Sequence, residues 1–137
     1  MRVKLDEGAY APEKAHPEDA GYDLRAREDA RIAPYGGRYV FHTGVHVEIP
    51  RGWCGQIWSK SGLHVINHIV TTGLIDSGYS GEIVVMLTNH HFNAYNVRCG
   101  DKIAQLVLTP CGDEEIQIVD QISGGARGDG GFGSTGR

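Results

Sequence analysis

The sequence has few cysteines and no long apolar run. Its three cysteines, Cys54, Cys99 and Cys111, form no C-x-x-C pair, which favours neither a disulfide scaffold nor a zinc site and fits a reducing compartment. No segment approaches the roughly 20 apolar residues that cross a bilayer, and residues 1–10 lack the apolar stretch of a signal peptide. We therefore expect no membrane association and a cytoplasmic location, although missing signals do not separate the cytoplasm from the nucleus.

An excess of basic residues is also missing. The chain has 13 Lys and Arg residues against 17 Asp and Glu residues, and its formal net charge is -4. Proteins that bind nucleic acid gain most of their affinity from clustered basic side chains, so no nucleic-acid partner is expected. A small anionic substrate needs only a local cluster. The 40% hydrophobic and 22% charged content is typical of a folded chain, and 137 residues suit one domain.

Long helices are the third absence, because 20 glycines, interspersed with Pro, Asn, Asp and Ser, interrupt the chain at short intervals. The segments between them are short and strand-like, which predicts an all-β sandwich or barrel. The expected strands are Arg2–Leu5, Val45–Ile49, Gly55–Trp58, Glu82–Thr88, Ile103–Leu108 and Ile116–Val119. One helical turn is expected within Ser59–Asn67, and a hairpin is expected over Ile83–Tyr95 with its tip at Asn89–Asn93.

The C-terminal segment differs from the rest in composition. Residues 123–137 contain seven glycines and one large apolar residue, Phe132. Such a segment buries too little apolar surface to join a core. We therefore expect a domain over residues 1–122 and a flexible glycine-rich arm over residues 123–137. A linker would need neither Arg127 nor Phe132, and a P-loop would need a G-K-[ST] ending that this arm lacks.

Three other segments contain groups suited to phosphate binding or proton transfer. Lys60, Ser61 and Gly62 supply a charge, a hydroxyl and glycine-permitted backbone N–H groups, which together suit a phosphate. Asp76 follows two apolar residues at a strand end, where it is either a turn former or a general base. Gln105 interrupts an apolar strand, where it either points outward or contacts a ligand.

In their order along the chain, these motifs resemble those of the trimeric dUTPase family. The resemblance extends from Ala20 to Gly136 and is carried by Ala20–Leu24, Gly73–Asp76 with Tyr79 and Gly81, Gly100–Leu106, and Arg127–Gly128 with Gly131–Gly136. Without the other motifs, Asp23 and Arg25 would be interpreted as a structural pair on one face of a strand.

The resemblance implies a distorted jelly-roll β-barrel that assembles as a homotrimer, with each active site built from all three chains. It implies a magnesium-dependent dUTP diphosphatase, which hydrolyses dUTP to dUMP and pyrophosphate by attack of water on the α-phosphorus. This reaction limits uracil incorporation into DNA and supplies dUMP for dTTP synthesis. Asp76 would be the general base, and Asp23 would contact, through water, an Mg2+ ion held by the three phosphates.

The same motifs imply roles for the other site residues. Tyr79 would lie under the deoxyribose and exclude a 2′-hydroxyl. The residues expected to bind uracil, largely through backbone groups, are Gly73, Leu74, Ile75 and Val84. Those expected to bind the phosphates are Lys60, Ser61, Gly62 and Gln105, the last on the α-phosphate or the attacking water. The arm would close over a neighbouring chain's site, with Phe132 on uracil, Arg127 on the phosphates, and Gly133, Ser134 and Thr135 around the γ-phosphate.

The sequence departs from the family pattern at two places. Lys60 stands where the family usually has Arg, which keeps the charge but loses the planar bidentate fork, so we expect phosphate binding with altered geometry. Val70 stands where some members have a uracil-binding Asn, so base recognition would depend more on the backbone. His64 and His68 have the i, i+4 spacing of a metal pair, but no acidic residue or Cys stands nearby to complete a site.

Two other functions compete with this interpretation. dCTP deaminase resembles dUTPases in fold, and Gly78 and Tyr79 are similar to its Gly-Phe pair. Its pattern has a catalytic Glu ten positions after the residue matching Asp76, however, where this chain has Met86, and a thioether cannot transfer protons. The second alternative is a protein-binding module without catalysis. The complete set of motifs favours an enzyme.

Overall fold

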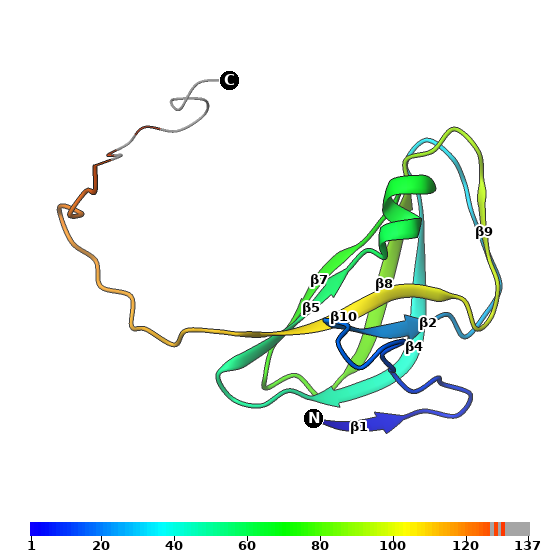
Figure 1. Ribbon diagram of the computed structural model, residues 1–137, viewed down its shortest axis with the longest axis horizontal. Coiled ribbons are helices and arrows are strands. Elements are labelled where there is room, and N and C mark those ends of the chain that lie inside the picture. The colour runs from blue at the N-terminus through cyan, green and yellow to red at the C-terminus, as the bar shows by residue number, and fades with distance from the viewer. Residues whose placement is uncertain (127, 129, 131–137) are drawn as a thin grey trace.

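The computed structural model describes residues 1–126, 128 and 130, and within them the chain is almost entirely β-structure (Figure 1). The strands are β1 (Arg2–Leu5), β2 (Gly21–Arg25), β3 (Ala30–Ile32), β4 (Gly37–Glu48), β5 (Trp53–Trp58), β6 (Ile69–Val70), β7 (Thr72–Ile75), β8 (Glu82–Asn89), β9 (Tyr95–Val97) and β10 (Lys102–Pro110). A short π-helical turn, η1 (Gly62–Ile66), precedes β6. The expected all-β class and the helical turn within Ser59–Asn67 are confirmed.

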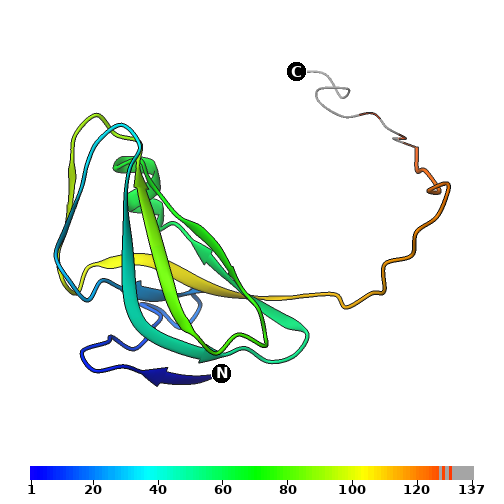
Figure 2. The same cartoon turned by 180° about the vertical axis from the view of Figure 1, so that it is seen from behind.

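Two four-stranded antiparallel sheets form the body of the fold. One has the strand order β1-β4-β8-β6 and the other β2-β10-β5-β7, while β3 and β9 form a separate two-stranded ribbon. Figure 2 shows the long strands β4 and β8 side by side. The core between the sheets is aliphatic with one phenylalanine, and its largest members include Phe41, Leu24, Ile83, Leu87, Ile103 and Leu106.

Strand β8 shows why the sequence forms this sheet. Ile83, Val85 and Leu87 are buried, whereas Val84 and Met86 between them are exposed, as expected for a period of two residues. Burying aliphatic side chains on one face stabilises the sheet by roughly 1.5–3 kcal/mol per side chain. On the other face of β8, the apolar side chains of Val84 and Met86 are exposed to solvent in the isolated chain.

Strand β4 is irregular near its middle. Its pairing with β8 shifts between His42 and His46, around Gly44, which has a φ of 68°. Only glycine adopts this left-handed conformation without strain, so Gly44 permits the bulge. The buried Thr43 donates its hydroxyl to the backbone carbonyl of Ile83 at 2.6 Å. The bulge therefore directs several polar side chains of β4 towards the segment that precedes β8.

Two sequence-based expectations are wrong. The segment Ile83–Tyr95 is not a hairpin, because β8 pairs with β4 and β6, whereas β9 pairs with β3. Ile116–Val119 forms no strand, and Ile116 and Ile118 are 94% and 99% exposed. Both segments have the right composition for a strand, but pairing depends on a partner that local sequence does not specify.

The chain leaves the body of the fold after β10. All residues from 111 to 126 are exposed and carry no helix or strand, and Figure 1 shows this stretch extending away from both sheets. Among the described residues, no helix is long and apolar enough to cross a membrane.

Candidate functional site

Three adjacent strands bring the first group of predicted site residues together. In the sheet β2-β10-β5, Gln105 pairs with Asp23 on one side and with Trp58 on the other. Its side-chain amide donates to the carbonyl of Ser59 at 3.1 Å. A Cβ at Gly21 would lie 2.6 Å from Oε1 of Gln105, so only glycine at this position leaves room for that side chain.

The carboxylate of Asp23 is buried and paired with two lysines. Its side chain is 7% exposed, Lys60 contacts one oxygen, and the Nζ of Lys102 lies 2.6 Å from the other. Burial alone would raise the pKa of Asp23, but the hydrogen bonds from Lys102 and Lys60 outweigh it and hold that pKa below its usual value. The pairing of Asp23 with Arg25 that these two residues alone would suggest is absent, since Arg25 contacts Glu13 at 2.6 Å.

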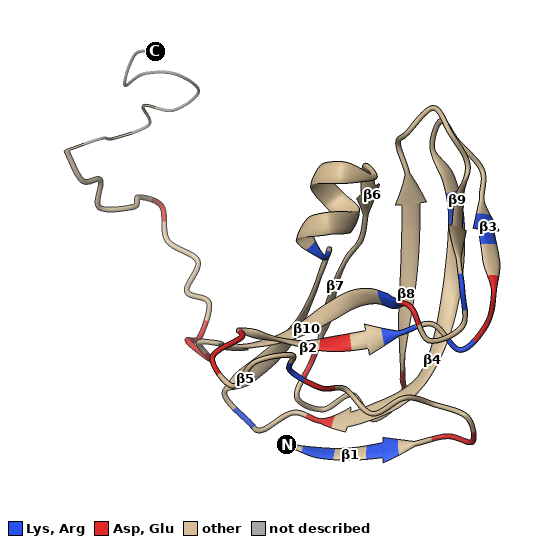
Figure 3. Cartoon of the chain, turned by 45° about the vertical axis from the view of Figure 1, so that its right-hand side comes forward, with Lys and Arg blue, Asp and Glu red and all other residues tan. Residues whose placement is uncertain are grey.

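The charges of this cluster suit an anion better than a bare cation. Two ammonium groups and one carboxylate leave a formal charge of +1, and both lysine side chains are partly exposed. Figure 3 shows the acidic residue on β2 and the basic residue at the start of β10. Ser61 and Gly62 are exposed at the start of the helical turn, and a Cβ at Gly62 would meet nothing within 4 Å. A phosphate can therefore approach this corner from solvent.

We expect Asp23→Asn to lower the free energy of unfolding at neutral pH by about 2 kcal/mol, because the neutral amide can accept a hydrogen bond from only one of the two lysines and forms an ion pair with neither. The folded pKa of Asp23 is depressed, so its contribution is present above the unfolded value and disappears as pH falls through the folded value. Urea denaturation of both chains at pH 7 and at pH 3 measures this. If the difference in free energy of unfolding between the original chain and Asp23→Asn were the same at both pH values, the ion-pair explanation would be contradicted.

The second group of predicted residues lies along β7 and the loop that follows it. Strand β7 pairs with the edge of β5 and holds Gly73, Leu74 and Ile75, of which Leu74 is 64% exposed. A pocket of about 310 Å³ lies beside it, lined by residues of β5 and β7 that include Trp58, Gly73 and Leu74. Asp76 follows at the strand end and is exposed. In the described part of the chain, its carboxylate makes no hydrogen bond or ion pair.

Tyr79 is held by the turn that connects Asp76 to β8. Its backbone N–H donates to the Asp76 carbonyl at 3.0 Å, and its hydroxyl donates to the Glu82 carbonyl at 2.9 Å. A Cβ at Gly81 would collide with the phenol ring of Tyr79. This collision explains why glycine stands at position 81. Val84, another predicted uracil contact, is 43% exposed on the outward face of β8.

The two groups lie at opposite ends of one strand pair. Ser59 follows Trp58 at one end of β5, whereas Asp76 follows Ile75, which pairs with Gly55 near the other end. This register separates Ser59 from Asp76 by five residue steps, or about 16 Å at the usual rise of a strand. Within one chain, the phosphate-type residues and the predicted base are therefore not neighbours.

The structure adds Lys102 and Gly21 to the residues proposed from sequence. Both stand in the motifs, but their roles depend on contacts with Asp23 and Gln105 that only the strand register reveals. The predicted arm residues Arg127, Phe132, Gly133, Ser134 and Thr135 lie outside the described residues. The three cysteines are free thiols. Among the described residues, no group of three His, Cys, Asp or Glu side chains could hold a metal ion, and this includes the surroundings of His64 and His68.

Comparisons with known proteins identify relatives along nearly the whole chain. The family model described as dUTPase matches residues 7–136. The deoxyuridine 5'-triphosphate nucleotidohydrolase of Gloeothece citriformis is 44% identical over 137 residues, which cover 98% of this chain and 94% of the relative. The enzyme of the same name from Clostridium tetani is 42% identical over 141 residues, with 100% and 97% covered.

Solved structures lead to the same family. The dUTPase of Staphylococcus bacteriophage 80alpha with dUpNHpp superimposes with a TM-score of 0.92 at 33% identity, covering 99% of this chain and 98% of that one. A variant dUTPase from phage phi11 of S. aureus, whose structure shows a structural Mg(II) ion, has a TM-score of 0.81 at 31% identity, covering 88% and 96%. With near-complete coverage by both sequence and structure, the chain belongs to the dUTPase family.

Proposed function

We propose that this chain hydrolyses dUTP to dUMP and pyrophosphate, with Asp76 as the general base. The observation that carries the assignment of the base is the exposed carboxylate at the end of β7, which makes no hydrogen bond or ion pair with the residues that the structure describes. Membership of the dUTPase family supports the reaction, and relatives over 40% identical carry the corresponding enzyme name.

The chemistry follows from the free carboxylate of Asp76. An ionised carboxylate accepts a proton from water, and the resulting hydroxide-like oxygen attacks the α-phosphorus of dUTP. The bond between the α-phosphorus and the bridging oxygen then breaks, and pyrophosphate leaves with the electron pair. Gln105, whose amide is already held by Ser59, would orient the α-phosphate or the attacking water. The position of the Gln105 side chain depends on Gly21, because a larger residue at position 21 would collide with it.

Uracil would bind along β7 and the outward face of β8. The backbone of Gly73, Leu74 and Ile75 forms one edge of its sheet, and Val84 presents an exposed apolar side chain. Fixed backbone donors and acceptors can pair with the O4 and N3–H of uracil and leave the amino group of cytosine mismatched. Tyr79 would contact the deoxyribose with its ring and offer no partner to a ribose 2′-hydroxyl.

The corner that contains Lys60, Ser61, Gly62 and Lys102 would bind the triphosphate. The net positive charge of this corner attracts a polyanion, while its two ammonium groups repel a free cation. An Mg2+ ion fits here as part of the nucleotide complex, with Asp23 reaching it through water, because oxygen ligands and retained water are what this ion prefers. When bound, magnesium would neutralise negative charge that develops on the phosphates.

A complete site would need more than one chain, and we propose a homotrimer. The separation of Ser59 from Asp76 along β5 supports this, since the proposed base and the proposed phosphate contacts lie at opposite ends of the strand pair within a single chain. The exposed apolar side chains of β8 and of the segment after β10, including Met86, Ile116 and Ile118, also support assembly, because such surface is normally covered. Residues 1–122 would form the domain, and the arm at 123–137 would close over a neighbouring site through Arg127, Phe132 and Gly133–Thr135.

The substrate is tested by incubating the purified chain with dUTP, dCTP, dTTP and UTP, with magnesium and with excess chelator. We expect pyrophosphate from dUTP alone, and little turnover after chelation. Ammonia release from dCTP would instead identify a deaminase. Tight dUTP binding without any product would identify a binding module. The first of these alternatives is already disfavoured by Met86, which is partly exposed on β8 where a catalytic Glu would be needed.

We expect Gly81→Ala to change substrate selection more than stability. The added methyl group displaces the phenol ring of Tyr79, which is the end of an exposed side chain and can move without disturbing the core. The thermal midpoint should stay within a few degrees of the original, while the preference for dUTP over UTP in kcat/KM falls by about tenfold. Unchanged selectivity would show that Tyr79 does not contact the sugar.

A further inference from the structure

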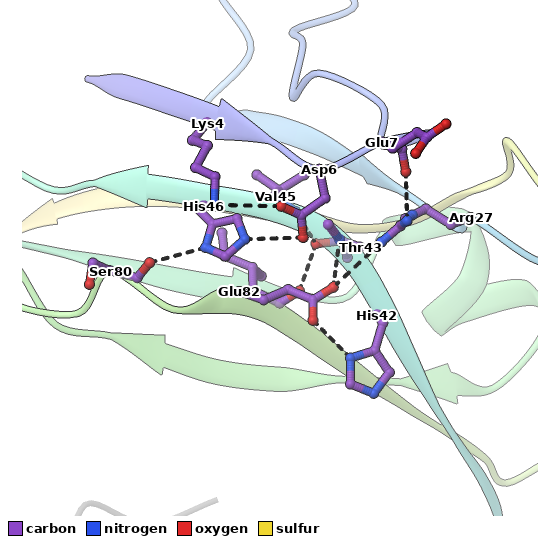
Figure 4. A network of polar contacts seen from close by, with 12 residues as sticks. Lys4, Asp6, Glu7, Arg27, His42, Thr43, Val45, His46, Ser80 and Glu82 are labelled. Atoms are coloured by element: carbon purple, nitrogen blue, oxygen red, sulfur yellow. Dashed lines mark hydrogen bonds and ion pairs between the residues drawn. The ribbon is translucent and has the colours of Figure 1, made fainter.

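A network of polar and charged side chains connects β4 to Ser80, the residue that follows Tyr79 (Figure 4). Its centre is His46 of β4, immediately after the bulge at Gly44. The Nδ1 atom of His46 lies 3.0 Å from the backbone carbonyl oxygen of Ser80, and its Nε2 atom lies 3.2 Å from a carboxylate oxygen of Asp6. The side chain is 18% exposed. One imidazole thus connects the segment after β1 to the loop before β8.

The two partners of His46 fix its protonation state. A carbonyl oxygen and a carboxylate oxygen can only accept hydrogen bonds, so both ring nitrogens must donate. Imidazole donates from both nitrogens only as the imidazolium cation. The contacts with Ser80 and Asp6 raise the pKa of His46 above its ordinary value, in agreement with the geometry. The geometry at His46 is therefore that of an imidazolium whose two N–H groups both donate.

The surrounding charges favour this cation. In the strand ladders, His46 pairs with Lys4 of β1 and with Glu82 of β8. Lys4 also contacts Asp6 at 3.6 Å and partly opposes the effect of that carboxylate on His46. A pocket of about 440 Å³ lies beside the ring, and its charged or titratable lining residues are Arg2, Lys4, His46, Glu48 and Tyr79. Arg2 and Glu48 neutralise each other at 2.5 Å.

On the far side of the network, Glu82 is held by contacts that do not involve the His46 side chain. Its carboxylate accepts the Gly44 backbone N–H at 2.6 Å and contacts Nδ1 of His42 at 2.8 Å and Nη1 of Arg27 at 4.0 Å. Loss of the His46 proton would therefore leave the Glu82 end of the loop in place. It would release the Ser80 end, next to Tyr79.

We propose that His46 is a positioning residue whose imidazolium form holds the loop of Asp76 and Tyr79 through Ser80, so that deprotonation of His46 loosens this loop. The proposal rests on the function proposed above for Asp76 and Tyr79. When one proton is lost, the other stays on Nε2, because the Asp6 carboxylate is a stronger acceptor than a carbonyl. Nδ1 then presents a lone pair to the Ser80 oxygen, and that hydrogen bond is replaced by repulsion.

The proposal is tested with His46→Asn and His46→Ala. The amide nitrogen of Asn occupies the place of Nδ1 and donates to Ser80 at every pH. Between pH 6 and pH 9, the KM of the original chain for dUTP should rise about fivefold relative to that of His46→Asn, which corresponds to the loss of one hydrogen bond. His46→Ala should show the higher KM throughout, with a smaller change in kcat, because the hydrogen bond from the Tyr79 N–H to the Asp76 carbonyl does not depend on His46. His16→Asn is the matched control, because His16 also lies near a carboxylate, that of Asp19, but is far along the chain from this loop.

An independent measurement uses the chain without substrate. In nitrogen NMR spectra, both ring nitrogens of His46, identified by their loss in His46→Asn, should be protonated at pH 7. A neutral ring at pH 7, or KM profiles of the original and His46→Asn chains that run parallel with pH, would overturn the proposal. If the original chain does not hydrolyse dUTP at any pH, the proposed function fails, while the NMR titration still decides the protonation of His46.

Discussion

Replacing Asp76 by Asn is expected to lower kcat for dUTP by at least about 10³-fold, because the amide has no basic lone pair to take a proton from water. The change keeps the size of the side chain, and in the described part of the chain the carboxylate of Asp76 has no hydrogen bond or ion pair to lose. Folding should therefore be unaffected. Pyrophosphate release measured over a range of dUTP concentrations separates kcat from KM.

Two further measurements decide what a loss of activity in Asp76→Asn means. The variant should still bind the non-hydrolysable analogue dUpNHpp with an affinity close to the original, since the carboxylate is proposed to act on water and not on the base. Asp29→Asn is a suitable control, because Asp29 is also exposed, and its Oδ1 contact with the Cys99 N–H can survive as an amide oxygen. Turnover by Asp76→Asn within tenfold of the original would assign the base to another group.

Two inactive variants should regain activity when their chains are mixed. One carries Asp76→Asn, and the other carries Lys60→Ala with Ser61→Ala. We consider sites that take the base from one chain and the phosphate contacts from another. With equal amounts of the two variants and random assembly, the chain that supplies the base is intact in half of the sites, and the chain that supplies the phosphate contacts is intact in half. About one quarter of the original activity should then return. The experiment refolds the two chains together from denaturant and measures pyrophosphate from dUTP.

The control for this mixing experiment uses a chain that carries all three substitutions. Mixed with Asp76→Asn, it should give no recovery, because every chain then lacks the base. Recovery in the first mixture but not in the second would establish that the site is shared. No recovery in either mixture, with assembly verified by light scattering, would place the base and the phosphate contacts in one chain and would contradict the register-based separation of Ser59 from Asp76.

The sequence supports some parts of this description much better than others. The strand β8 follows from the short apolar run Ile83–Leu87 between polar residues, because a run of this length rich in β-branched residues is typical of a strand. The family and its reaction follow from motifs spread over the whole chain. These features are encoded locally, either as periodicity or as short motifs.

Other features depend on contacts between distant segments. The expected hairpin over Ile83–Tyr95 was wrong because β9 pairs with β3, which lies more than 60 residues earlier in the sequence. The expected strand at Ile116–Val119 has no partner within the described chain. Likewise, no motif indicates that Lys102 shares Asp23 with Lys60, or that His46 reaches Ser80, since these pairs meet only through the register of strands within the two four-stranded sheets.

The placement of the two half-sites at opposite ends of β5 has a consequence for how the activity depends on protein concentration. If neither half acts alone, catalytic output follows the assembled fraction and not the total amount of chain. Turnover per chain should then be constant at high concentration and fall steeply on dilution, once the assembly begins to dissociate. In the proposed assembly, mass action would thus regulate the reaction without any additional ligand.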